Sequence, residues 1–204
     1  MNLTMLLEMA ADGFGDRVVI GRREDGLTAT GLREAALRGA AEIEAHGADA
    51  VVYLAANGPA FPVAMFAAAY AGVPLVPLNF RLGVEQLEGL LEKHPGALGI
   101  GDTTALPILA RSGIVALGVE EWLVRTTFGG EVDERFVDND VPAVVIYTSG
   151  TTSAPKGVLL RHGNLTSYVL STVEYAGAGD DEAALVSVPP VSYTHLTLPT
   201  NREV

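Results

Sequence analysis

The chain has 204 residues, of which 49% are hydrophobic and 19% are charged. This length suits one domain or one and a half, and the hydrophobic share excludes an intrinsically disordered chain. The net charge of −12 argues against a protein that binds nucleic acids or anionic membranes through a basic surface. The absence of cysteine excludes disulfides, cysteine-based zinc sites and thiol nucleophiles, and it fits a reducing compartment.

No segment has the pattern of a targeting signal or of a membrane span. Residues 1–9 are apolar but lack a basic leading segment, and their spacing predicts a short amphipathic helix. The longest apolar stretch, residues 58–78, contains four prolines and is divided by Gly72. We interpret it as a helix followed by a buried strand, and we expect a cytoplasmic protein.

Strand and helix signals alternate along the first part of the chain. Short apolar runs, the first two forming a hairpin, predict strands at residues 18–20, 27–28, 50–55, 73–78, 97–101 and 114–117. Apolar residues at helical spacing predict helices at residues 30–47, 59–71, 84–94 and 105–110. Thr30 is the expected N-cap of the first of these, and Pro74 and Pro77 weaken the strand at 73–78 or place it at an edge.

The composition changes after this alternating part. Residues 129–140 are acidic and poor in apolar side chains, which predicts a solvated connector rather than a cation site. A buried strand is expected at 143–147, a helix from Asn164 to about residue 175, and a further strand at 183–188. Strands that alternate with helices predict an α/β fold with a mainly parallel sheet flanked by helices.

The segment that follows the strand at 143–147 combines hydroxyl groups, glycines and a lysine. Gly150 allows the backbone to approach a ligand closely, and neighbouring N–H and hydroxyl groups can surround an anion. Lys156 supplies a compact positive charge for phosphate oxygens. The candidate nucleotide-binding residues are Thr148, Ser149, Gly150, Thr151, Thr152, Lys156 and Gly157, with Lys156 as the candidate catalytic residue.

Other interpretations of this loop are possible from composition alone. Serine, threonine, glycine and proline also form ordinary surface turns, although such a turn needs neither this many hydroxyl groups nor a lysine. A Walker loop is excluded, because Gly157 follows Lys156 where a Mg²⁺-binding hydroxyl residue is required. The glycine-rich dinucleotide fingerprint is also absent after this strand.

The order of residues 148–157 closely resembles the phosphate-loop signature of the adenylate-forming superfamily, which includes acyl-CoA synthetases, peptide-synthetase adenylation domains and luciferases. Ser153 departs from the usual glycine. Residues 71–81, 162–165 and 188–190 resemble further segments of the same family, so the resemblance extends along nearly the whole chain to Pro190. The details are more similar to an acyl-CoA synthetase of the fatty-acid–CoA ligase type than to a peptide-synthetase module.

This resemblance implies a two-step reaction of a carboxylic acid with ATP, Mg²⁺ and coenzyme A. The acid first forms an acyl-adenylate and pyrophosphate, and coenzyme A then displaces AMP. Residues 1–190 would be an incomplete N-terminal domain of such an enzyme, so the 204-residue chain alone is expected to lack turnover. A non-catalytic nucleotide- or anion-binding module is the alternative, and the acid, the metal ligands and the oligomeric state are left open.

Four other residues are weaker candidates. His46 and His94 lie near predicted helix ends, where a cation meets the negative end of the helix dipole. His162 is expected to be a surface histidine beside a helix start. Trp122, the only tryptophan, is expected to pack in the core rather than to stack on adenine.

The last residues, 191–204, do not continue the family's pattern, which places an aromatic residue and a histidine after Pro190. Residues 191–200 instead resemble the translation of a transposon-type sequencing adapter. We therefore expect residues 191–204 to be a non-native tail, and His195 is not the family's histidine. Long-read sequencing of the locus tests this expectation, because the aromatic–histidine pair should then appear directly after Pro190.

Overall fold

The computed structural model describes residues 1–128, 137–148, 155–172, 177, 179 and 182. The strand predicted at 183–188, the tail at 191–204 and most of the acidic connector lie outside these residues. The described part of the connector ends in exposed positions 138–140, which agrees with a solvated segment, whereas Val137 is buried.

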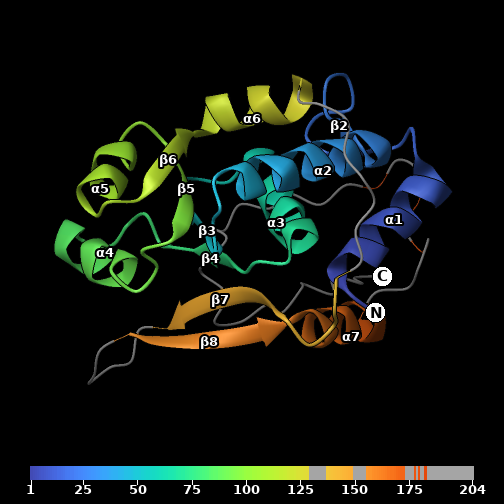
Figure 1. The fold of residues 1–204 in the computed structure, drawn as a ribbon. Helices are drawn as coiled ribbons and strands as arrows, with labels where there is room; N and C mark the ends of the chain where they lie inside the picture. The colour runs from blue at the N-terminus through green and yellow to red at the C-terminus, as the bar shows by residue number, and fades with distance from the viewer. Residues whose placement is uncertain (129–136, 149–154, 173–176, 178, 180–181, 183–204) are drawn as a thin grey trace, which may run out of the picture.

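A six-stranded sheet forms the centre of the molecule, with strand order β6-β5-β3-β4-β7-β8 (Figure 1). All neighbouring strands are parallel except β7 and β8, which form an antiparallel hairpin. The strands are β3 (Ala50–Leu54), β4 (Leu75–Pro77), β5 (Ala97–Gly101), β6 (Val115–Gly118), β7 (Pro142–Thr148) and β8 (Lys156–Arg161). The predicted α/β fold with a mainly parallel sheet is confirmed, as is the small hairpin of β1 (Val18–Ile20) and β2 (Leu27–Thr28).

Helices cover both faces of the sheet, so the molecule has three layers (Figure 1). One face packs against α2 (Ala29–Ala45), α3 (Ala60–Ala71) and α6 (Val119–Phe128), and the other against α4 (Val84–Leu91) and α5 (Leu106–Arg111). Two further helices, α1 (Leu3–Phe14) and α7 (His162–Thr172), lie together beside β7. Successive residues of β3 reach opposite faces, which explains why the whole strand is apolar and buried.

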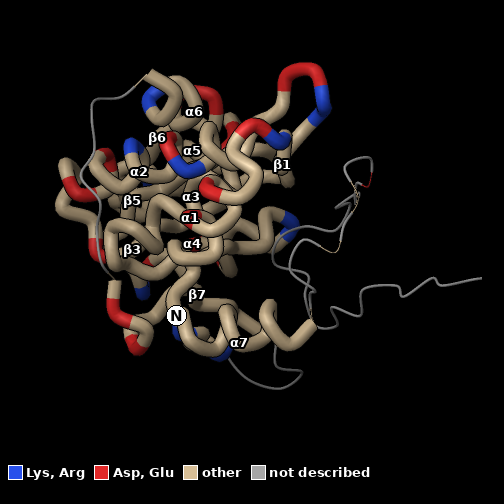
Figure 2. The backbone as a smooth tube through the Cα atoms, turned by 90° about the vertical axis from the view of Figure 1, so that its right-hand side faces the viewer, with Lys and Arg blue, Asp and Glu red and all other residues tan. Residues whose placement is uncertain are grey.

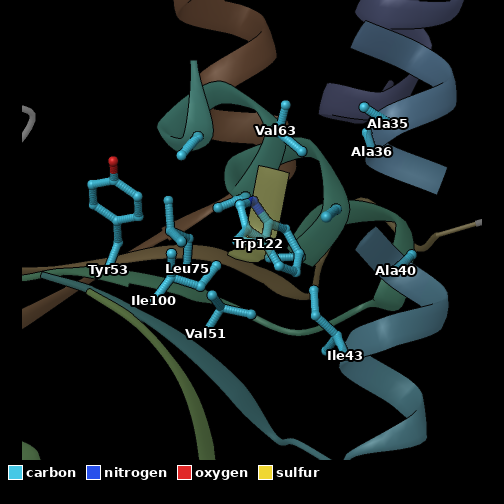
Figure 3. Packing of buried hydrophobic residues seen from close by; sticks show 14 of the residues in the cluster. Ala35, Ala36, Ala40, Ile43, Val51, Tyr53, Val63, Leu75, Ile100 and Trp122 are labelled. Atoms are coloured by element: carbon cyan, nitrogen blue, oxygen red, sulfur yellow. The ribbon is translucent and has the colours of Figure 1, made fainter. Parts of the chain in front are cut away.

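Trp122 occupies the centre of the larger core, between α2 and the sheet (Figure 3). Its side chain is fully buried, as the prediction of a packing role requires. Gly39 on α2 makes room for it, because a Cβ there would lie 2.8 Å from the Trp122 Cη2 atom and 2.7 Å from the Ala67 Cβ atom. Small residues on α2 and α3 therefore allow the two helices to approach each other around one large aromatic ring.

The prediction that β4 lies at a sheet edge is wrong, because β4 lies between β3 and β7. Leu78 donates to the Tyr53 carbonyl, and the Pro74 carbonyl accepts from Val51, so residues 74 and 78 bond toward β3. Pro77 has the opposite orientation, and its missing N–H group faces β7. Since β7 pairs with β4 only at Leu75, the ladder on that side has ended before Pro77 is reached.

Several helix ends differ from the predictions. The N-cap of α2 is Thr28, whose Oγ1 accepts from the Gly31 N–H at 3.0 Å, rather than Thr30. Helix α4 ends at Leu91, three residues earlier than predicted. Helix α7 begins at His162, two residues earlier than predicted, and the Asn164 side chain accepts from the Arg161 N–H. Helix α6 was not predicted, because only two of its residues are buried and its apolar pattern is weak.

The surface carries charges of both signs, spread over most of the helices (Figure 2). Helix α7 is an exception, since it contains no Lys, Arg, Asp or Glu and exposes Tyr168 and Leu170. Within the described residues, no helix is both long and apolar enough to span a bilayer.

Candidate functional site

The β7–β8 hairpin presents the two ends of the predicted phosphate loop. Thr148 is the last residue of β7 and Lys156 the first of β8, and the two are directly opposite each other in the antiparallel register. Directly paired residues have their side chains on the same face of a hairpin. The hydroxyl group of Thr148 and the ammonium group of Lys156 therefore lie on one face, on either side of the loop. Residues 149–154, which include Ser149, Gly150, Thr151 and Thr152, lie outside the described residues, so their ligand contacts stay a prediction.

Lys156 is exposed, and its ammonium group has no hydrogen bond or ion pair with any residue that the structure describes. Thr148 is also exposed, with a long 3.5 Å contact from its Oγ1 atom to the Lys156 carbonyl. An exposed ammonium group beside a hydroxyl group at the end of a β-strand is suited to bind phosphate oxygens, because both groups can donate to an anion.

Gly157 has a packing role that the sequence did not reveal. It is paired with Tyr147, and a Cβ at Gly157 would lie 3.3 Å from the Tyr147 Cε1 atom. The ring of Tyr147 therefore covers the backbone at Gly157. This contact gives a structural reason for a glycine directly after Lys156, in addition to the predicted role in ligand binding.

Two residues of the segment between α4 and β5 contact the loop end of the β7–β8 hairpin. The Nε2 atom of His94 lies 2.8 Å from the Tyr147 hydroxyl oxygen, and the two rings meet edge to face. The Lys93 ammonium group donates to the Pro155 carbonyl at 3.4 Å and lies 5.1 Å from the centre of the Tyr147 ring. No pattern in the sequence predicts this group, because its members come from two segments that are far apart along the chain.

His94 lies close to the end of α4, as predicted, and its N–H donates to the Leu91 carbonyl, but its side chain does not meet the helix end as a cation. Helix α4 has ended at Leu91, and the imidazole of His94 faces the hairpin instead. Burial lowers the pKa of His94 below its ordinary value, an effect that Lys93 adds to and Asp49 opposes. Burial also raises the pKa of Tyr147. Both side chains are therefore neutral at pH 7, which allows the Tyr147 hydroxyl group to donate to His94.

The other two histidines differ from each other. His46 is the C-cap of α2, and its Nδ1 atom lies 2.8 Å from the Glu42 carbonyl oxygen, so the predicted position at a helix end is confirmed. His162 was predicted to be at the surface, but it is fully buried. Its Nδ1 atom accepts from the Leu3 N–H at 3.4 Å, and burial lowers its pKa. This contact connects the junction of β8 and α7 to the start of α1, although 159 positions separate the two residues in the sequence.

No metal centre is formed by the described residues, which contain no group of three or more histidine, aspartate or glutamate side chains that could hold an ion.

Residues 7–198 match the family described as AMP-binding enzyme. The chain belongs to this family. Feruloyl-CoA synthase from an Amycolatopsis species is 34% identical over 170 residues, which cover 79% of this chain and 31% of that protein. Tyrocidine synthase 3 from Brevibacillus parabrevis is 29% identical over 194 residues, which cover 90% of this chain and 3% of that protein.

Among solved structures, o-succinylbenzoate-CoA synthetase from Bacillus subtilis in complex with an acyl-adenylate intermediate is similar, with a TM-score of 0.75 and 25% sequence identity. The match covers 90% of this chain and 49% of that chain. Family membership and this fold agree with the resemblance inferred from residues 148–157. The chain spans about a third of the length of feruloyl-CoA synthase, as the 31% coverage states.

Proposed function

We propose that this chain is the N-terminal part of an ATP-dependent acid–thiol ligase. In the first step, a carboxylate oxygen attacks the α-phosphorus of ATP, the bond to the bridging oxygen breaks, and pyrophosphate leaves. In the second step, the thiol of coenzyme A attacks the acyl carbon and loses its proton, and AMP leaves. The observation that carries the proposal is the pairing of Thr148 with the exposed Lys156 at the two ends of the loop in an AMP-binding enzyme.

Each group of the hairpin has a role in the first step. Lys156 neutralises negative charge that builds on the leaving pyrophosphate, and the hydroxyl and N–H groups of residues 148–152 hold its oxygens. Mg²⁺ arrives with ATP and neutralises phosphate charge. Because phosphoryl chemistry depends mainly on positioning and charge, a fixed hairpin with a cation at its end is an effective way to supply both.

The acid and the acceptor are chosen by parts of the protein beyond this hairpin. A fatty acid is one candidate, and the relation to feruloyl-CoA synthase adds aromatic acids. Coenzyme A is the proposed acceptor, and the relation to tyrocidine synthase 3 makes a carrier-bound thiol the competing one. We place the enzyme in the cytoplasm, where ATP and coenzyme A are available.

The test is acid-dependent exchange of labelled pyrophosphate into ATP by the full-length protein, across a panel of fatty, aromatic and amino acids. We expect exchange with one class of acid and none without acid. ATP binding without exchange for any acid would favour the alternative of a non-catalytic nucleotide-binding module. The 204-residue chain alone should show no sustained AMP release, because it offers only the phosphate end of the site.

A further inference from the structure

We propose that Lys93 and His94 are positioning residues that fix the stem of the phosphate loop from one face and leave the other face to the nucleotide. This inference rests on the proposed function, but its structural part can be tested without any activity. The chain contains only two lysines, Lys93 and Lys156, and both lie at the loop end of the β7–β8 hairpin.

The two contacts hold the two sides of the stem separately. His94 contacts Tyr147, near the end of β7, and Lys93 contacts the carbonyl group of Pro155, directly before β8. Because Lys93 and His94 are consecutive, one short segment after α4 fixes both ends of the loop relative to the sheet. Figure 1 shows the loop end of the hairpin on the same side of the molecule as α4.

The positioning residues and the proposed ligand-binding residues lie on different faces of the hairpin. Side chains alternate along a strand, so Tyr147 and the following Thr148 point to opposite faces. Tyr147 packs with the core on the α4 side, together with Val145. Thr148 and its partner Lys156 therefore lie on the face that Lys93 and His94 do not occupy. The positioning contacts and the ligand-binding groups are on opposite faces of the same two strands, and neither obstructs the other.

The contacts of Lys93 and His94 are of kinds that can hold the hairpin in one position. A lysine ammonium group over a tyrosine ring gains a cation–π attraction in addition to its hydrogen bond to Pro155. The hydrogen bond between Tyr147 and His94 links two neutral, half-buried side chains, so phosphate charge on the far face disturbs it little. The groups that face His94 are the Asp49 carboxylate, the Lys93 ammonium group and the Tyr147 hydroxyl group.

The experiment compares Lys93→Met, Lys93→Arg and His94→Phe in the full-length protein. We expect Lys93→Met and His94→Phe to lower kcat/KM for MgATP roughly 10- to 100-fold, because small misplacements of reacting groups have effects of this size. The KM for the acid and the thermal midpoint should stay near those of the wild type, and Lys93→Arg should recover part of the loss. Arg111→Met is the matched control, since it removes one positive charge from neighbouring α5, where Arg111 pairs with Glu88.

Hydrogen–deuterium exchange without nucleotide gives the second measurement. Faster exchange of the β7 and β8 amides in Lys93→Met and His94→Phe, with β3 and β5 unchanged, supports the proposal even if no acid gives pyrophosphate exchange. Unchanged exchange at the hairpin overturns the proposal. This holds even if the activity of the variants falls, since Lys93 would then contact the nucleotide directly. A lower thermal midpoint with exchange increased throughout the sheet also overturns it, because the two residues would then support the fold in general.

Discussion

Strands β3 and β8 belong to one sheet but differ in almost every physical respect. Every residue of β3 is buried, whereas all residues of β8 are exposed except Leu160, which is half-buried. The first strand is held by apolar packing on both faces, and the second by the β7 ladder and a few polar contacts. The comparison indicates that stability resides in the three-layered part and that the proposed chemistry resides where packing contributes least.

The largest expected effect is in the core. Trp122→Ala should lower the free energy of unfolding by about 3–5 kcal/mol, because it removes a large buried side chain and leaves a cavity. Leu159→Ala on β8 is the matched variant, and it should change the free energy by less than about 0.5 kcal/mol since the side chain is 60% exposed. Urea unfolding measures both. Equal losses for the two variants would contradict the proposed difference between the regions.

The opposite result is expected at the hairpin. Lys156→Ala should reduce the transition-state stabilisation of adenylation by roughly 2–4 kcal/mol, as for the loss of one charge-stabilising group. Its unfolding midpoint should stay unchanged, because an exposed lysine contributes little to stability. Pyrophosphate exchange and urea unfolding on the same preparation separate the two effects. Wild-type exchange kinetics in this variant would remove Lys156 from the mechanism.

Two glycine-to-alanine substitutions test how much close packing between helices contributes to stability. Gly39→Ala should lower the free energy of unfolding by about 1–3 kcal/mol, since the added Cβ collides with Trp122 and Ala67. Gly89→Ala on α4 should instead raise it by about 0.5–1 kcal/mol, because its Cβ meets nothing within 4 Å and alanine favours the helix. The same chemical change thus has opposite signs. A stabilising Gly39→Ala would show that α2 and α3 are less closely packed than described.

A smaller, pH-dependent effect is expected at His162. Burial lowers its folded-state pKa below the unfolded value of about 6.5. Above that value both states are neutral and the group has no effect, whereas at lower pH the unfolded chain binds a proton first. Stability should therefore fall as the pH falls from about 6.5. His94 contributes in the same direction, and urea unfolding of His162→Gln at pH 7.5 and 5.5 should show a weaker dependence on pH than the wild type.

The smallest effect is expected from deleting residues 191–204. Residues 191–204 resemble a translated adapter, and a segment of that origin would not have been selected to pack against this fold, so the free energy of unfolding should change by less than about 0.5 kcal/mol. Urea unfolding of the shortened chain is the measurement. A clear loss of stability would instead indicate that the tail is a native part of the protein.

Much of the fold could be predicted from local patterns. Continuous apolar runs identified β3 and β5, and Gly47 and Gly72 marked helix ends where φ is positive. These signals are local, because burial on both faces and left-handed backbone conformation restrict residue types directly. Helix α6 was missed for the converse reason, since its exposed side chains outnumber its buried ones.

The candidate site also has one part that local sequence patterns predict and one part that they do not. The loop at 148–157 was recognisable because its hydroxyl groups, glycines and Lys156 are consecutive in sequence. The contact between His94 and Tyr147 was not recognisable, because 53 positions separate the two residues, and the contact between Lys93 and Pro155 spans 62. Only the folded chain brings the segment after α4 to the hairpin.

The sequence by itself determined the family and the alternation of strands and helices, and it supplied the hypothesis for the loop at 148–157, since each follows from residues that are neighbours along the chain. The tertiary structure decided the place of β4 inside the sheet, the burial of His162 and the contacts of Lys93 and His94 with the hairpin. These features depend on which strand lies beside which and on where a loop meets a distant hairpin. Side-chain chemistry permits such contacts, but only packing of the whole chain selects them.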